Sequence, residues 1–226
     1  MIVGGDKLVY DGDPSSPTIS LLNTKIFLNS VISYAHKGER FSSADIKNHH
    51  LQSPMKQFQY MHIPLKYFTD EIRQEYNIMD ISENGYGYIE IRKGIYSFKI
   101  AGIIAFNYVV NNVAPHGYYP VRYTPSLWKH ETRKTTLMLC VDDFGIKHHS
   151  QDDLDHLLNA LRTKYDISTE PSGTNYIGLT IVWQYNKRYV DISMPDYVRK
   201  ALQKCLHNPP TRQQHAPYKW TELAYC

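Results

Sequence analysis

The stretch LMLCVDDFGIKH, residues 137–148, places two adjacent carboxylates between two apolar segments. Segments 137–141 and 144–148 each have the length of a short strand, which predicts a β-hairpin that turns at Asp142 and Asp143. Two-residue hairpin turns favour Asn-Gly, Asp-Gly or Gly-Gly, so Asp-Asp is a poor turn sequence that also sets like charges side by side. An unfavourable turn sequence without a structural gain indicates a functional site. Carboxylates on a rigid tip suit a divalent cation such as Mg²⁺.

A third acid, Asp45, ends the short strand-like run FSSAD, residues 41–45. Taken alone, each acid is most simply a solvated surface carboxylate. Carboxylates from a strand end and a distant hairpin can instead converge on two metal ions roughly 3.5–4 Å apart, the arrangement of two-metal phosphoryl transfer. The metal hypothesis therefore depends on Asp45 folding back to face Asp142.

Six short motifs follow one another along nearly the whole chain. They are FSSADIKN (41–48), IRKGIYSFKIAG (91–102), HGY (116–118), PSLW (125–128), CVDDFG (140–145) and YIGL (176–179). Each motif alone is a weak signal. Their order and spacing together resemble the reverse transcriptase region of a copia-type retrotransposon polyprotein.

The resemblance implies an α+β fold: a palm-like antiparallel sheet covered by helices on one face, with partial fingers and the start of the thumb. Residues 1–206 would form this domain, with fingers-like structure in residues 1–40 and 54–90. A thumb-proximal hairpin and helix would begin at about residue 175. Residues 207–226 are expected to be an irregular tail leading toward a missing ribonuclease H region, and an integrase region would be missing as well.

The activity implied by the resemblance is RNA-directed DNA polymerisation, a two-metal nucleotidyl transfer to a primer 3′ hydroxyl. Its cofactor would be Mg²⁺ or Mn²⁺, and its partners a primed RNA or DNA template and deoxynucleoside triphosphates. Asp45 and Asp142 are the expected catalytic metal ligands, with Asp143 as the third acid. Lys99 and His50 are expected to contact nucleotide or template, and Gly178 to lie at the primer end.

Several positions depart from the family pattern. Where the family carries a Phe or Tyr that excludes the ribose 2′-hydroxyl, this chain has His50. The family has Gly at Ser97 and Gln at Ile100, and an Ile side chain cannot hydrogen-bond. The fingers Lys or Arg pair that grips the triphosphate is also absent. Two alternatives therefore stay open: an inactive remnant with weak nucleic-acid binding, and a metal-dependent hydrolase, which lacks an obvious general base near the hairpin.

Composition sets further limits. The net charge of +3 permits nucleic-acid binding without indicating it. No apolar run reaches about 18 residues, and the N-terminal MIVGG lacks the features of a signal peptide, so neither a membrane span nor secretion is expected. Three separated cysteines argue against a disulfide framework or a Cys-x-x-Cys zinc site. We expect an intracellular protein, in the cytoplasm or in a virus-like particle.

Apolar periodicity and helix start signals predict five helices, over about residues 17–37, 64–76, 97–112, 151–161 and 195–206. Ser150 with acids after it resembles a capping box for the fourth helix. A second hairpin is expected to turn at Asn186 and Lys187. His49 and His50, placed next to each other on a strand, would face opposite sides and could not easily chelate one metal together.

Overall fold

The computed structural model describes residues 12–206, so residues 1–11 and the tail 207–226 lie outside the described residues. Its centre is a six-stranded sheet in which every neighbouring pair is antiparallel. In spatial order the strands are β5 (Tyr118–Val121), β6 (Thr124–His130), β7 (Thr136–Cys140), β8 (Asp143–His148), β1 (Arg40–Ile46) and β9 (Ile167–Glu170). The chain therefore has the mixed α and β composition and the antiparallel sheet that the sequence predicts.

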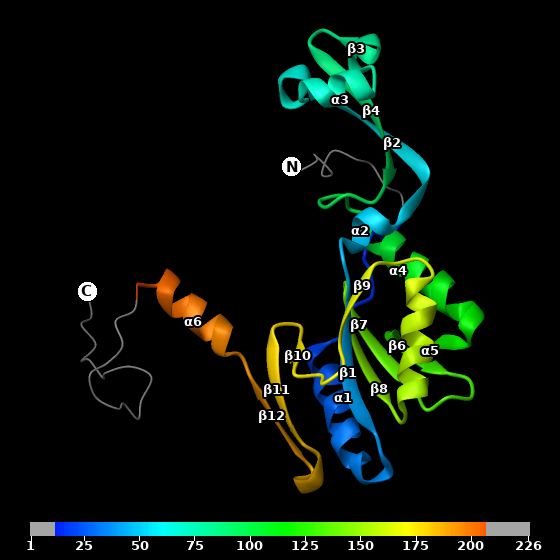
Figure 1. The fold of residues 1–226 in the computed structure, drawn as a ribbon, viewed down its shortest axis with the longest axis vertical. Helices are drawn as coiled ribbons and strands as arrows, with labels where there is room; N and C mark the ends of the chain where they lie inside the picture. The colour runs from blue at the N-terminus through cyan, green and yellow to red at the C-terminus, as the bar shows by residue number, and fades with distance from the viewer. Residues whose placement is uncertain (1–11, 207–226) are drawn as a thin grey trace.

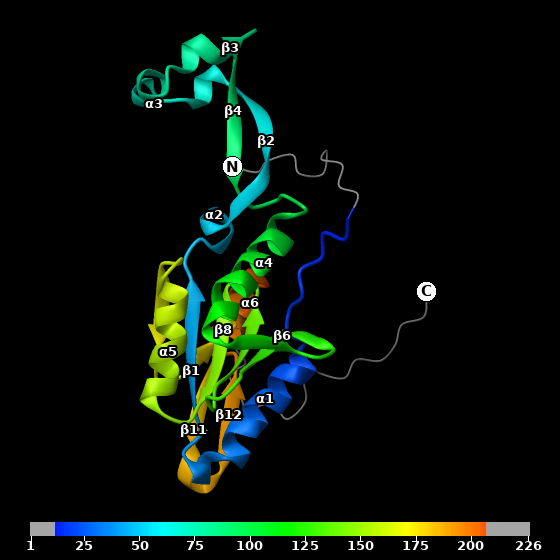
Figure 2. The same cartoon turned by 90° about the vertical axis from the view of Figure 1, so that its right-hand side faces the viewer.

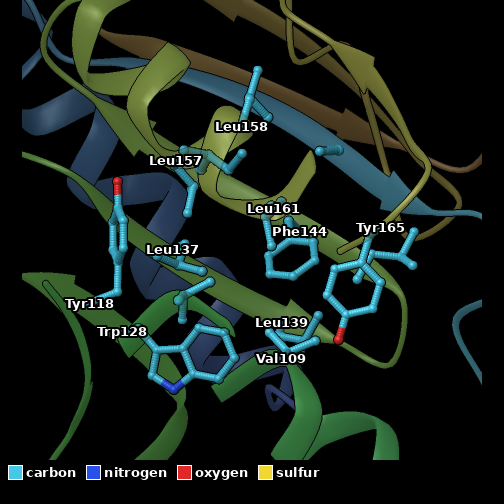
Figure 3. Close-up of a cluster of buried hydrophobic side chains, with 14 of the residues drawn as sticks. Val109, Tyr118, Trp128, Leu137, Leu139, Phe144, Leu157, Leu158, Leu161 and Tyr165 are labelled. Carbon is cyan, nitrogen blue, oxygen red and sulfur yellow. The ribbon is translucent and has the colours of Figure 1, made fainter. Parts of the chain in front are cut away.

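One face of this sheet is covered by two helices, α4 (Ala101–Val113) and α5 (Gln151–Arg162) (Figure 1). Helix α5 begins as predicted, because the Ser150 Oγ accepts a hydrogen bond from the Asp153 N–H at 3.1 Å. Both helices pack on the sheet through one core, in which Leu157 and Leu161 of α5 meet Leu137 and Phe144 of the sheet (Figure 3). These side chains are almost fully buried, so this layer holds the β7–β8 hairpin rigidly.

The opposite face is also covered, which corrects the expectation of helices on one face only. Helix α1 (Leu21–Ser33) packs there with a second sheet formed by β10 (Asn175–Tyr176), β11 (Leu179–Gln184) and β12 (Tyr189–Ser193). Phe41 and Met138 supply the apolar surface of the main sheet on this side. The expected turn at Asn186 and Lys187 is present as the short 3-10 helix η6 (Tyr185–Lys187).

The third sheet forms an arm that projects beyond α2 (His49–Gln52) at one end of the molecule (Figures 1 and 2). It contains β2 (Pro54–Pro64), β4 (Tyr86–Lys93) and β3 (Ser82–Glu83), in the order β2-β4-β3. Near the far end, α3 (Asp70–Glu75) follows the Thr69 cap, so the helix expected over residues 64–76 is much shorter. The remaining 3-10 helices are η2 (Ala35–Lys37), η3 (Leu65–Tyr67), η4 (Ile78–Ile81) and η5 (Ala114–His116).

Two helices begin later than the sequence predicts. Helix α1 starts at Leu21, because Ser20, rather than Ser16, caps it by accepting from the Asn23 N–H at 3.1 Å. Helix α4 starts at Ala101, because Ser97 has a φ of +83°, which is incompatible with a right-handed helix.

Apolar helix faces are less completely covered than their periodicity suggests. Leu21, Leu22 and Ile26 of α1 are exposed, whereas Phe27 and Val31 are buried. Helix α6 (Pro195–Lys204) starts at the predicted proline but buries no residue. Within residues 12–206, no helix combines the length and apolarity needed to cross a membrane.

Candidate carboxylate site

The tip of the β7–β8 hairpin is a two-residue turn made of Val141 and Asp142. Cys140 and Asp143 pair across the strands, so Asp143 is the first residue of β8 and the predicted Asp-Asp turn is wrong by one position. Val141 has a φ of +60°, whereas Asp142 does not have a positive φ. Positive φ at the first central residue is typical of a type II′ turn, which favours glycine there, so a β-branched valine is strained.

Asp45 lies beside this tip. It is the next-to-last residue of β1, and its Cα is paired with that of Asp143 on the neighbouring strand β8. The Ile46 N–H donates to the Asp142 carbonyl oxygen at 3.0 Å, which ties the end of β1 to the turn. The Ser168 Oγ donates to Asp45 Oδ2 at 3.4 Å from β9 on the other side. The fold therefore brings all three predicted acids to one end of two adjacent strands.

The three carboxyl groups influence one another electrostatically. Burial raises the pKa of Asp143 to about 6, and the charges of Asp142 and Asp45 add to this increase. Burial also raises the pKa of Asp45, again with help from the charge of Asp142. Like charges held close together disfavour ionisation. A bound cation would offset this repulsion and favour the ionised carboxylates.

The donor set suits a hard cation, but it does not form a closed chelate. Among residues 12–206, no three His, Cys, Asp or Glu side chains are arranged so that they could hold a metal ion by themselves. Mg²⁺ commonly uses only one or two carboxylates and completes its octahedral shell with water and substrate phosphates. Asp45 and Asp142 fit that partial role, with Asp143 as a neighbouring third acid.

His50 lies close enough to the tip for the charge of Asp142 to act on it. It is half-buried on helix α2, and its ring contacts that of Tyr96 with centroids 5.0 Å apart. Burial lowers the pKa of His50 and the charge of Asp142 opposes that decrease. His50 is therefore mainly neutral near pH 7. The fold thus brings a histidine near the hairpin, and whether it acts as a general base stays untested.

His49 was not predicted to belong to the site. The two histidines lie on a helix rather than a strand, with rings stacked at 5.9 Å, because Asn48 turns the chain with a φ of +50°. His49 is only 2% exposed, and burial followed by the charge of His50 lowers its pKa to about 4. With Val141 and Ala105 it lines a very small cavity behind the turn. Its pairing with His50 was visible in the sequence, but its burial depended on the packing of α4.

Lys99 lies away from the carboxylates. It precedes α4 and lines a cavity of about 540 Å³ between α4 and β2. The described residues that line it include none of the three acids. The structure therefore does not bring Lys99 together with Asp45 and Asp142.

Gly178 lies in the turn between β10 and β11. Its φ is +76°, following Ile177 at +44°, and a Cβ at this glycine would meet no atom within 4 Å. The turn needs a positive φ here, which glycine adopts without steric penalty, and the expected place of Gly178 at a primer end stays a prediction. The neighbouring Tyr176 is buried, and its ring faces the tip closely enough for the charges of Cys140 and Asp143 to raise its pKa further, after burial.

Comparison with family models and with curated proteins identifies no relative of this chain. No protein-family model matches the chain, and no curated protein matches it. The candidate site is therefore defined by its own residues: three acids at the end of β1 and β8, with His50 beside them.

Proposed function

We propose that this chain is the palm-containing part of a copia-type reverse transcriptase, which transfers nucleotides to a primer 3′ hydroxyl by two-metal chemistry. The observation that carries the proposal is the meeting of Asp45 with Asp142 and Asp143 at one end of adjacent antiparallel strands. These acids come from segments far apart in the sequence. The helices packed behind the sheet give them the rigid support that a catalytic site needs.

The backbone at Ser97 gives independent support. Its φ of +83° lies in the region that glycine adopts without steric penalty, and the family has glycine at this position. The turn that precedes α4 therefore has the conformation that a family glycine would favour, although the side chain differs.

Each group of the chain has a distinct role in the proposed reaction. Asp45 and Asp142 would hold Mg²⁺ or Mn²⁺, and Asp143 would add negative charge beside them. The bound metal would supply Lewis acidity to the primer hydroxyl and the triphosphate. His50 would lie under the sugar of the incoming nucleotide. The strained Val141 would fix the direction in which Asp142 points.

Primer extension tests this proposal directly. Folded protein is mixed with an annealed template and primer, deoxynucleoside triphosphates and Mg²⁺, and compared with Asp142→Asn. We expect extension by the native chain and a loss on the order of a thousandfold in the variant, because the metal-binding charge is removed. The exposed Asp155 of α5 provides the matched control, and Asp155→Asn should retain full extension. No extension by the folded native chain, or equal extension by Asp142→Asn, would overturn the proposal.

One observation favours the alternative of an inactive remnant. Ile100 contributes to the cavity on the outer side of α4 and brings an apolar side chain where the family has a hydrogen-bonding Gln.

The position of His50 favours the other alternative, a hydrolase, because a mainly neutral imidazole beside a metal site can act as a general base. The same protein should therefore be assayed for Mg²⁺-dependent phosphodiester cleavage. Cleavage without extension, abolished by His50→Phe, would identify a hydrolase.

A further inference from the structure

A buried histidine, at the end of β8 opposite the acidic turn, connects three parts of the fold. His148 is 7% exposed, and its Nδ1 lies 3.0 Å from the carbonyl oxygen of Ser150, the residue that caps α5. Its Nε2 lies 3.0 Å from the Oγ of Ser42 on β1. The same Oγ lies 2.8 Å from the carbonyl oxygen of Pro171, which begins the β9–β10 loop, residues 171–174.

The number of protons decides which of these three hydrogen bonds can form together. A carbonyl oxygen only accepts, so the Nδ1 of His148 must carry a proton to bond Ser150. In a neutral imidazole the Nε2 then has none, and Ser42 has a single hydroxyl proton to donate either to Nε2 or to Pro171. One of the two bonds is therefore missing. In the imidazolium form Nε2 donates to Ser42, the hydroxyl donates to Pro171, and all three bonds form.

The β9–β10 loop is also attached to β1 at a second point. The Oγ of the neighbouring Ser43 donates to the carbonyl oxygen of Asn175, which begins β10, at 2.7 Å. A Cβ at Gly173 would lie 2.5 Å from the Phe41 carbonyl oxygen, so the loop packs closely on the strand. Of these attachments, only the one through Ser42 involves a histidine, the side chain that commonly titrates near neutral pH.

Charged groups on the elements around His148 act on its ring in opposite directions. Burial is the largest influence and lowers the pKa of His148, whereas the bond to Ser150 opposes that decrease. Glu39, which precedes β1, and Asp153 of α5 also oppose it, and Arg40 of β1 adds to it. The ring is therefore mainly neutral near pH 7, and the imidazolium forms under acidic conditions.

Three further titratable side chains next to this network have contacts of their own. Lys147 on β8 donates to a serine of α1 at 3.3 Å. The Glu170 carboxylate at the end of β9 accepts from the Thr174 N–H at 2.6 Å. The His149 ring packs against Gly38. None of these contacts involves the hydroxyl or the carbonyl of the network, so its proton count depends on the buried imidazole.

We propose that protonation of His148 ties the β9–β10 loop more firmly to β1, so that acidic conditions order this loop and neutral conditions loosen it. The inference concerns the hydrogen bonds of the loop and stands apart from nucleotidyl transfer. The loop leads to Tyr176 of β10, whose ring adjoins the acidic turn. A change in pH would thus alter how firmly the chain is held just before this residue.

Amide hydrogen exchange and NMR spectroscopy of the native chain test the proposal. The His148 ring is titrated, and the Gly173 amide, which donates to the Glu170 carbonyl oxygen at 3.2 Å, reports on the loop. We expect the protection factor of this amide, which corrects for the intrinsic pH dependence of exchange, to rise about fivefold as His148 becomes protonated, because about one hydrogen bond is added. An unchanged protection factor across the titration of His148 would overturn the proposal.

Two variants test the coupling itself. In Ser42→Ala the His148 ring should still titrate while the protection factor of Gly173 no longer follows it, because the shared hydroxyl is absent. His148→Gln cannot titrate and should likewise abolish the rise, so it serves as the second test if Ser42→Ala does not fold. A rise of native size in either folded variant would contradict the assignment.

Three matched controls separate this network from general effects of pH. Ser43→Ala removes the neighbouring hydroxyl, so it should lower the protection factor of Gly173 at every pH yet keep the rise. His149→Gln removes an adjacent imidazole and should also keep it. Asp143→Asn removes a carboxyl that titrates near pH 6 and should keep it as well. Loss of the rise in Asp143→Asn, with retention in Ser42→Ala, would assign the effect to the acidic turn and overturn the proposal.

Discussion

Two tight turns in this molecule place a β-branched residue in left-handed backbone, but their surroundings differ. Ile177, with a φ of +44°, is half-buried and packs against the apolar cluster between α1 and the main sheet. Val141, with a φ of +60°, is 44% exposed and adjoins Asp142. Burial of Ile177 offsets the strain of its turn, whereas the Val141 turn combines strain with like-charge repulsion. Uncompensated strain of this kind occurs most often at functional sites.

Removing a charge beside the Val141 turn should have the largest effect. We expect Asp45→Asn to lower primer extension on the order of a thousandfold while the melting temperature stays nearly unchanged. Ile177→Asn changes the other turn and should leave extension within about twofold, since no carboxylate lies in that turn. Similar losses of primer extension in both variants would show that the Val141 turn is no more important for activity than the Ile177 turn.

Replacing His50 tests whether this side chain contacts the sugar of the incoming nucleotide. We expect His50→Phe to raise the preference for deoxynucleotides over ribonucleotides about tenfold, because a larger apolar ring leaves less room for a 2′-hydroxyl. The measurement is the ratio of kcat/KM for the two substrates. A variant with unchanged selectivity would show that His50 does not contact the sugar.

The pH dependence of stability should report the repulsion among the acids. The pKa of Asp143 in the folded chain, about 6, is above the ordinary value, so the folded state binds more protons between about pH 4 and pH 6. The free energy of unfolding should therefore fall as pH rises through this window. Asp143→Asn should flatten the slope and stabilise the protein at pH 7 by roughly 1 kcal/mol, less than the full pKa increase implies because the carboxyl keeps contact with water.

Urea denaturation at several pH values checks this prediction. Asp155→Asn is again the control, and it should retain the native slope. A free energy of unfolding of the native chain that rises between about pH 4 and pH 6 would contradict the sign derived from the raised pKa of Asp143.

The smallest expected effect concerns the strain itself. Asparagine tolerates left-handed backbone, so Val141→Asn should stabilise the fold by roughly 1 kcal/mol. Ile177→Asn relieves similar strain but loses apolar contact, and should bring no gain. Thermal unfolding of both variants makes the comparison. Equal stabilisation would show that burial does not offset the strain at Ile177.

Local signals in the sequence predicted much of the framework. Two apolar segments of strand length predicted the β7–β8 hairpin, and Ser150 predicted the start of α5. The exact turn residues were not accessible, because the pairing of Cys140 with Asp143 depends on strand register in the assembled sheet. One-residue errors of this kind reassign a side chain from the turn to the strand.

Tertiary packing explains what the sequence did not predict. Periodicity gives a helix an apolar face but does not show what covers it, and so the exposed Leu22 and the uncovered α6 were not anticipated. The cavity beside Lys99 needs β2 and α4 to meet, and no local pattern indicates this. The metal hypothesis and the family resemblance both linked Asp45 to the hairpin, and the sheet places it there.

Direct measurement of cation binding tests the central claim, that the acids at the end of β1 and β8 form one cation site. Mn²⁺ can be titrated into the protein and free Mn²⁺ followed by its electron paramagnetic resonance signal. We predict weak binding by the native chain, loss of binding in Asp45→Asn and Asp142→Asn, and full binding in Asp155→Asn. Equal Mn²⁺ binding by all four proteins, or no binding even with a nucleoside triphosphate present, would contradict the account.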